Sequence, residues 1–211
     1  MRLLDLFCGA GGAGMGYHRA GFEVVGVDID PQPDYPFEFH QADAMTFPLD
    51  GFDAIHASPP CHDHSSISPG ENGTGWMLRA TVDRLAKSGT PWVCENVVGP
   101  GVRMGGWWFV LCGSMFDMQV RRHRRFGSSH LMIPPAHRHK EQGRPYTITG
   151  HGGGCESKHS LKPKASDFWR YMDMPWMEGR PAYGVAQAIP PAYTEWIGGQ
   201  LMQHLAIPAE P

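Results

Sequence analysis

The distribution of apolar residues along the chain predicts alternating strands and helices. Short apolar runs occupy residues 2–7, 22–28, 52–58 and 91–97. Their length and their polar or glycine-containing boundaries are typical of buried strands. Between the last two runs, Leu78, Val82 and Leu85 recur at helical spacing, and Gly89 is placed to end that helix. Strands separated by helices indicate an α/β fold with a mostly parallel sheet and helices on both faces.

The second half of the chain has a less regular pattern. After Phe126 the periodicity is lost until a final helix, predicted from the apolar positions at Tyr193, Ile197, Leu201 and Leu205. With 211 residues, 27 of them Gly and 19 Pro, we expect one compact domain with many loops. We divide it into a core (1–126), a small basic, loop-rich segment (127–185) and a C-terminal helix returning to the core (186–211).

The composition indicates where in the cell the protein is expected and the state of its cysteines. No stretch approaches the ~18 apolar residues of a membrane span, and the amino terminus lacks the features of a signal peptide. We therefore expect a cytoplasmic protein without a membrane or obligate protein partner. The five cysteines, an odd number without a CxxC pair, predict reduced thiols rather than a disulfide framework or a cysteine-paired zinc site.

The charges are distributed unevenly. Residues 119–164 hold ten Lys or Arg and two acids, whereas the rest of the chain holds eight basic and nineteen acidic residues. A basic segment on an acidic body is typical of a surface that binds nucleic-acid phosphates, although a solvated basic loop would have the same composition. Six of the twelve histidines also lie in this segment, but without regular spacing, so no metal site is expected.

A glycine-rich stretch follows the first predicted strand. In CGAGGAGMG, Gly9, Gly11 and Gly14 satisfy the pattern GxGxxG, and Asp28 ends the next strand nineteen residues after Gly9. Glycines allow the backbone to approach a nucleotide, and an acid at this position can accept hydrogen bonds from ribose hydroxyls. The pattern predicts an adenosine cofactor. A tight strand-to-helix turn with a surface aspartate is the alternative. Asp43 could accept a hydrogen bond from an adenine amine.

Two further stretches hold candidate chemistry. In ASPPCHDHS, Cys61 directly follows two prolines and precedes His62 and His64. The stretch alone is compatible with a metal ligand, a buried cysteine or a nucleophile. Glu95 lies within an apolar run, where a carboxylate is unusual unless it is paired or functional.

Five motifs occur in an order that resembles a known family. They are DLFCGAGG (5–12), PPC (59–61), ENV (95–97), RRHRRF (121–126) and AQAIPPAYTEWIG (186–198). The chain resembles S-adenosylmethionine-dependent DNA methyltransferases acting at carbon 5 of cytosine, and most of all the small methylases of bacteriophages. The resemblance spans nearly the whole chain. It implies a Rossmann-like methyltransferase fold, S-adenosyl-L-methionine as cofactor and double-stranded DNA as partner, in the bacterial host cytoplasm if phage-encoded.

The resemblance assigns roles to the candidate residues. It makes Cys61 the nucleophile that adds to carbon 6 of a flipped cytosine, and Glu95 the residue that holds ring nitrogen 3 and the exocyclic amine. The family pattern QxRxR makes Arg122 and Arg124 the arginine pair that reaches the cytosine carbonyl, with Val120 in place of glutamine. A register starting at Gln119 would select Arg121 and His123 instead. We prefer the first register, because it places Phe126 at the family's usual aromatic position.

Further residues are implied around the cofactor and the nucleic acid. The residues expected at the cofactor are Phe7, Cys8, Gly9, Gly11, Gly12, Asp28, Ile29, Asp43 and Pro60. Those expected at the phosphates are Arg121, Arg125, Lys158, Lys162 and Lys164. The chain departs from the family where Ala186 and Gln187 replace Gly-Asn before the final prolines. Only 59 residues separate Phe126 from Ala186, so the target-recognition region is reduced and a short target of about two to four base pairs is expected.

Other functions remain open on the sequence. SPPC approaches the Ser-Pro-Pro-aromatic motif of methyltransferases that modify exocyclic amines, and a related enzyme acting on transfer RNA shares most of the motifs. A free nucleotide substrate, a modified methyl donor and a catalytically silent nucleic-acid binder are further alternatives. The presence of Cys61, Glu95 and the arginine cluster favours carbon 5 methylation.

Overall fold

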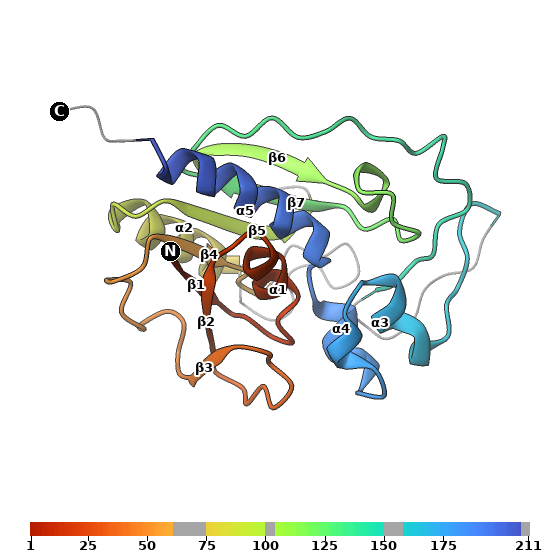
Figure 1. Ribbon diagram of the computed structural model, residues 1–211, viewed down its shortest axis with the longest axis horizontal. Coiled ribbons are helices and arrows are strands. Elements are labelled where there is room, and N and C mark those ends of the chain that lie inside the picture. Colours follow the sequence, from red (N-terminus) through yellow and green to blue (C-terminus); the bar gives the residue numbers. More distant parts are fainter. Residues whose placement is uncertain (61–74, 100–103, 150–157, 208–211) are drawn as a thin grey trace.

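A seven-stranded sheet forms the centre of the molecule in the computed structural model (Figure 1), which describes residues 1–60, 75–99, 104–149 and 158–207. The strands are β1 (Arg2–Leu6), β2 (Glu23–Asp28), β3 (Glu38–Gln41), β4 (Ala54–Ala57), β5 (Trp92–Val97), β6 (Trp107–Leu111) and β7 (Arg124–Ser128). Their order across the sheet is β3-β2-β1-β4-β5-β7-β6. The first five strands are parallel, and β7 runs antiparallel to both β5 and β6. The predicted α/β fold with a mostly parallel sheet is confirmed.

Helices cover both faces of this sheet. They are α1 (Gly12–Arg19), α2 (Gly75–Lys87), α3 (Phe168–Tyr171), α4 (Ala182–Gln187) and α5 (Pro191–Leu205), with 3-10 turns η2 (Gly113–Met115), η3 (Ala165–Asp167) and η4 (Pro175–Met177). On one face, Tyr17 of α1 and Tyr193 of α5 pack against Phe126 and neighbouring strand residues. On the other face, Leu78 and Leu85 of α2 pack in the second core cluster. No helix of the described ranges is long and apolar enough to cross a membrane.

The segment after β7 is only partly loop. Its second half folds into η3, α3, η4 and α4, where Phe168, Met172 and Val185 form a third apolar cluster with Ala10 of the glycine loop and Val120. Figure 1 shows α3 and α4 together beside the carboxyl ends of the parallel strands. The boundary expected between residues 185 and 186 falls inside α4. The part of the chain formed by η3, α3, η4 and α4 therefore packs against the core and reaches the same edge of the sheet as the glycine loop.

The strand order places a crevice at that edge. From β1 the chain proceeds to β2 and β3 on one side, whereas β4 and β5 lie on the other side. At such a switch point the connections leave β1 and β4 in opposite directions, so the space above their carboxyl ends is free for a ligand.

Candidate active site

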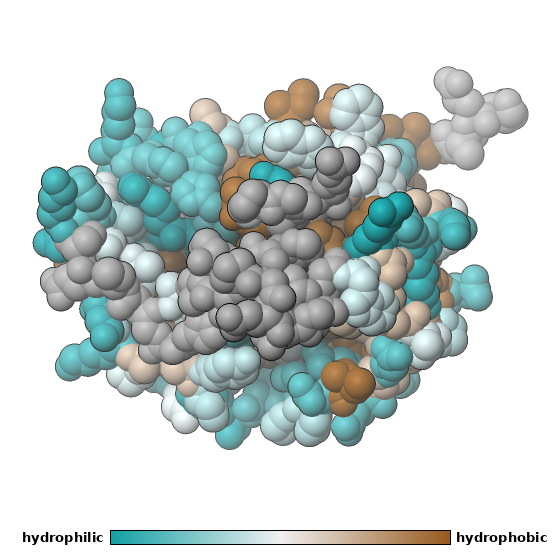
Figure 2. Space-filling model, turned by 180° about the vertical axis from the view of Figure 1, so that it is seen from behind, coloured by the Kyte–Doolittle hydropathy of each residue, from teal (hydrophilic) through white to brown (hydrophobic). Residues whose placement is uncertain are grey.

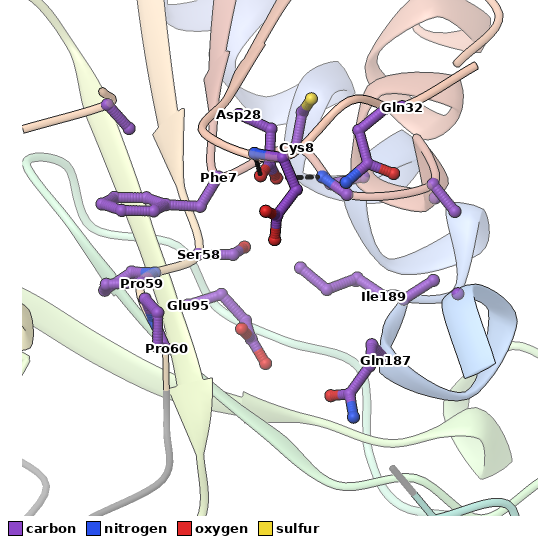
Figure 3. A pocket seen from close by; sticks show the side chains of 18 of the residues that line it. Phe7, Cys8, Asp28, Gln32, Ser58, Pro59, Pro60, Glu95, Gln187 and Ile189 are labelled. Atoms are coloured by element: carbon purple, nitrogen blue, oxygen red, sulfur yellow. Dashed lines mark hydrogen bonds between the residues drawn. The ribbon is translucent and has the colours of Figure 1, made fainter. Parts of the chain in front are cut away.

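A pocket of about 380 Å³ opens at this switch point. Figure 3 shows the side chains of the glycine loop, Asp28, the Pro59–Pro60 turn and Glu95 around it, with Gln187 and Ile189 on the opposite wall. The volume falls within the ~300–1,000 Å³ typical of small-molecule sites. The pocket is therefore large enough for a nucleoside-sized cofactor.

Asp28 lies at the end of the pocket where an adenosine cofactor is expected. Its Oδ2 accepts a hydrogen bond from the Gly9 amide at 2.9 Å, and its Oδ1 accepts one from the Asp30 amide at 3.0 Å. The turn between β1 and α1 also places Phe7 at a φ of 58°. Each carboxylate oxygen has two lone pairs, so Asp28 keeps acceptor capacity for ribose hydroxyls while it fixes the glycine loop. These residues fit an adenosine group.

Eight of the nine residues expected at the cofactor line the pocket. They are Phe7, Cys8, Gly9, Gly12, Asp28, Ile29, Asp43 and Pro60. Gly11 is not among the lining residues. It has a φ of 83°, and a Cβ there would lie 2.8 Å from Cδ of Pro36 and 3.1 Å from the ring of Tyr35. Gly11 is therefore required by backbone conformation and by packing against Tyr35, which favours a structural role over contact with a ligand.

Several other lining residues were not among those expected at the cofactor. They include Gln32, Ser58, Tyr183, Gln187 and Ile189. Gln187 is one of the two residues at which the chain departs from the family pattern, and this departure lies in the wall of the pocket. Tyr183 lies in the irregular segment, where no sequence signal indicated proximity to the glycine loop.

Asp5 is buried directly beneath the glycine loop. The Tyr35 hydroxyl donates a hydrogen bond to its Oδ2 at 3.1 Å, and no partner for its Oδ1 is found among the described residues. Burial, opposed by the hydrogen bond from Tyr35, raises the pKa of this carboxyl to about 7. The loop that would hold the cofactor thus rests on a carboxyl group that can retain its proton near neutral pH.

Glu95 occupies the other end of the pocket. It extends from β5, is 7% exposed, and points toward the cavity in Figure 3. Its Oε1 lies 2.8 Å from Nε of Arg124 and has no hydrogen-bond partner among the described residues. Burial raises the pKa of Glu95, and the positive charges of Arg124 and Arg122 act in the opposite direction. A buried acceptor without a hydrogen-bond partner among the described residues is suited to a ligand with an amine.

The two predicted site arginines have different positions. Arg124 lines the pocket beside Glu95. Arg122 is 4% exposed and donates hydrogen bonds from Nη1 to the carbonyl of Ile148 at 3.0 Å and from Nη2 to that of Ala186 at 2.7 Å. Its own carbonyl accepts a bond from the Tyr193 hydroxyl at 2.6 Å. Arg122 connects three segments of the chain and does not line the pocket. The structure therefore does not support its predicted contact with a base.

Asn96 links β5 to the proline turn. It is fully buried, and its Nδ2 donates a hydrogen bond to the carbonyl of Pro59 at 3.1 Å. This bond fixes the backbone two residues before Cys61. Cys61 itself, together with His62 and His64, lies outside the described residues, so its placement relative to Glu95 stays a prediction.

The residues expected at phosphates form two groups. Lys158, Lys162 and Lys164 are exposed, and hydrophilic side chains gather at the left edge of the molecule in Figure 2. Arg121 instead donates to Oε1 of Gln142 and to the carbonyl of His139, and the Arg125 guanidinium lies 5.3 Å from the Trp108 ring centroid. The lysines are available to a phosphate backbone, whereas the two arginines contact neighbouring protein groups.

Comparisons with known proteins agree with this architecture. Residues 1–99 match the model of the C-5 cytosine-specific DNA methylase family. A comparison with curated proteins gave no match. Among solved structures, the chain is similar to a protein assigned as a DNA modification methyltransferase encoded within an E. coli prophage, with 18% identity and a TM-score of 0.52. That alignment covers 74% of this chain and 56% of the prophage protein, so the chain spans little more than half of that relative.

Two further structures share the fold over almost the entire chain. The Dnmt2 methyltransferase of S. pombe is 13% identical with a TM-score of 0.70, and the alignment covers 98% of this chain and 100% of that one. A mutant of DNMT2 from Spodoptera frugiperda is 12% identical with a TM-score of 0.63, covering 95% and 99%. At these identities the similarity establishes the fold.

Proposed function

Because residues 1–99 match the model of the C-5 cytosine-specific DNA methylase family, we propose that the chain is a member of that family and transfers a methyl group from S-adenosyl-L-methionine to carbon 5 of cytosine in DNA. The observation that carries the proposal is the arrangement of one continuous pocket. Asp28 and the glycine loop form one end, and Glu95 with Arg124 forms the other end, next to the Pro59–Pro60 turn that leads to Cys61. A cofactor and a flipped base could thus meet inside one cavity.

The proposed chemistry explains why a thiol is needed. Carbon 5 of cytosine is too weak a nucleophile to accept a methyl group directly. In the proposed reaction the Cys61 thiolate adds to carbon 6, which gives carbon 5 the electron density of an enamine. Carbon 5 then takes the methyl group, loses its proton to a base, and the carbon 6–sulfur bond breaks to release the thiolate and restore the aromatic ring.

Glu95 and Arg124 have complementary roles in this proposal. The raised pKa of Glu95 favours a proton on the carboxyl, and a carboxyl that shares this proton with ring nitrogen 3 makes carbon 6 more electrophilic. Arg124, whose Nε lies 2.8 Å from the Glu95 Oε1, holds the carboxyl in place and lines the pocket, where it would reach the cytosine carbonyl. Asn96 acts as a positioning residue, because it fixes the Pro59 carbonyl and thereby the backbone that presents Cys61.

S-adenosyl-L-methionine would supply an electrophilic methyl group on a sulfonium. The residues that would hold it are Asp28 at the ribose, Phe7, Cys8, Gly9, Gly12 and Ile29 around the adenosine, and Asp43 near the adenine amine. The fit rests on the Asp28 carboxylate, whose oxygens are fixed by two backbone amides at the floor of the pocket.

RNA is the second candidate substrate. The sequence resemblance extends to an enzyme acting on transfer RNA, and the pocket recognises a base rather than the sugar backbone, so its chemistry is the same for both nucleic acids. DNA is preferred because the matching family model is that of DNA methylases.

The proposal is tested by incubating the protein with tritiated S-adenosylmethionine and, separately, duplex DNAs of varied sequence and transfer RNA, followed by nucleoside analysis. We expect 5-methylcytosine in DNA, and loss of transfer in Cys61→Ser and Glu95→Gln. Methyl groups found only in RNA would select the second candidate, and 4-methylcytosine would overturn carbon 5 chemistry. No transfer to any nucleic acid by a protein that binds the cofactor would favour a silent binder.

A further inference from the structure

Four side chains with metal-binding atoms converge away from the pocket described above. Cys112 follows β6, His123 directly precedes β7, and His137 and His139 lie on the segment after β7. One ligand atom from each residue lies within 4.8 Å of the ligand atoms of the other three. Cys112 is buried, His123 and His139 are half-buried, and His137 is exposed. The cluster therefore has three shielded ligands and one at its opening.

The separations are close to those of a tetrahedral metal site. With metal–sulfur and metal–nitrogen distances of about 2.3 and 2.0–2.1 Å, tetrahedral ligand atoms lie roughly 3.3–3.6 Å apart. The Cys112 Sγ and the His139 Nε2 are 3.3 Å apart. Ring centroids of the three histidines are 4.7–5.4 Å from one another. Small side-chain rotations would bring all four ligand atoms to the separations of a bound ion.

From this geometry we propose that Cys112, His123, His137 and His139 bind a zinc ion. One sulfur and three imidazole nitrogens form a donor set that suits zinc rather than magnesium or calcium, which prefer oxygen. Four protein ligands complete a tetrahedral coordination and leave no open position, so the site is structural rather than catalytic. This replaces the expectation of no metal site that the irregular histidine spacing suggested.

The surroundings are those of a supported metal site. The Ser114 hydroxyl donates to the Cys112 sulfur at 3.4 Å, and the same hydroxyl oxygen accepts from the Arg138 amide at 3.3 Å. The carbonyl of His139 accepts from Arg121 at 3.3 Å. Outer contacts of this kind orient metal ligands.

A bound zinc ion would hold the small segment after β7 in place against the sheet. A zinc ion would tie residues 137 and 139 of the segment after β7 to the end of β6 and to the start of β7. Because His123 directly precedes Arg124, it would also fix the strand end from which Arg124 reaches Glu95. The inference does not depend on the methyl acceptor, since it rests on the four ligands alone.

The test uses the full chain and measures metal directly. Protein purified with Zn²⁺ and dialysed extensively is expected to retain about one zinc ion per chain, as measured by elemental mass spectrometry. Co²⁺ added to metal-free protein should give the near-ultraviolet absorption of a thiolate–cobalt bond and the intense visible bands of tetrahedral cobalt. Chelation should lower the melting temperature, and Zn²⁺ should restore it.

Variants identify the ligands. His137→Ala removes the exposed ligand and should weaken zinc binding roughly tenfold or more, and Cys112→Ser should abolish the near-ultraviolet cobalt band. His130→Ala is the matched control, a histidine of the same segment outside the cluster, and should behave as wild type. If Cys112→Ser does not fold, His137→Ala and the metal-free wild type still decide. Wild-type protein without stoichiometric zinc or cobalt absorption, or His137→Ala with unchanged affinity, would overturn the proposal.

Discussion

At the scale of single residues, two buried carboxyl groups differ in their relation to the pocket: Glu95 lines it, and Asp5 lies beneath the glycine loop without lining it. Burial raises the pKa of both Asp5 and Glu95, but their surroundings differ. Glu95 faces the guanidinium of Arg124, whereas Asp5 meets the Tyr35 hydroxyl and is further destabilised as an anion by Asp28. Asp5 is therefore a source of pH-dependent stability at the cofactor loop.

The Asp5→Asn variant should isolate this effect. The folded-state pKa of about 7 lies above the ordinary value of 3.8, so the folded protein holds a proton that the unfolded chain has lost. The associated stability is fully present below about pH 4 and is lost as the pH rises to about 7, by up to ~1.4 kcal/mol per pH unit. Asn has no such titration.

Urea unfolding of both proteins between pH 5 and pH 8 measures this difference. The unfolding free energy of wild type relative to Asp5→Asn should fall from pH 5 to about pH 7 and then level off. A difference that does not change with pH would show that Asp5 is ionised in the folded protein at pH 5.

The roles of individual arginines could not be predicted from the sequence. Four arginines within five residues gave two possible registers, and the family pattern assigned Arg122 and Arg124 to the same site. Strand β7 begins only at Arg124, so the alternation of side chains along a strand does not extend to Arg122. The Arg122 guanidinium donates hydrogen bonds to the carbonyls of Ile148 and Ala186. Both residues are distant from Arg122 in the sequence, so only the tertiary structure shows these bonds.

At the scale of elements, the sequence predicted four of the five parallel strands and missed β3 and the antiparallel pair. β1, β2, β4 and β5 lie within the predicted apolar runs, because strands covered on both faces are continuously apolar. The missed β7 has the sequence RRFGS, whose charges indicate a basic cluster rather than a strand. β6 begins with Trp107 and Trp108, both exposed, and lies at the edge of the sheet. Both segments are strands because they pair with each other in the sheet, and the apolar pattern of the sequence does not show this pairing.

The contact between α1 and α5 provides a test at this scale. A Cβ on Gly16 would lie 2.1 Å from the Thr194 hydroxyl and 2.2 Å from the Pro191 carbonyl, whereas a Cβ on Gly199 of α5 would meet nothing within 4 Å. Gly16→Ala should therefore destabilise the protein by about 1–3 kcal/mol through overpacking. Gly199→Ala, the matched control, should stabilise it by roughly 0.5–1 kcal/mol because alanine favours the helix.

Chemical unfolding of wild type, Gly16→Ala and Gly199→Ala measures the change in unfolding free energy for each variant. The opposite signs are the essential result, since both changes add the same methyl group to a helix. A Gly16→Ala variant as stable as wild type would mean that α1 and α5 are farther apart than described.

At the scale of the whole molecule, the net charge of −3 conceals a basic segment on an acidic body. The exposed Lys158, Lys162 and Lys164 lie on this segment, and they contrast with Arg121 and Arg125, which contact protein groups. If the lysines meet phosphates, they contribute affinity without reading sequence.

Replacing the three lysines together by alanine should weaken binding to all duplex DNAs by a similar factor. Because neutralising a phosphate releases counterions, the slope of log affinity against log salt should become shallower by about 0.9 for each phosphate that is no longer neutralised. Fluorescence anisotropy at several salt concentrations measures both quantities. Unequal reductions in affinity between preferred and random duplexes would instead place these lysines at base edges.

We propose covalent catalysis by Cys61 at the pocket that Asp28 and Glu95 line. The most direct measurement is a denaturing gel of the protein incubated with S-adenosylmethionine and a duplex that carries 5-fluorocytosine at a methylated position. Fluorine cannot leave as a cation, so the wild-type protein should stay bonded to the DNA through sulfur and migrate as an adduct, and Cys61→Ser should form none. Methylation of ordinary cytosine in the same duplex without any adduct would contradict the account.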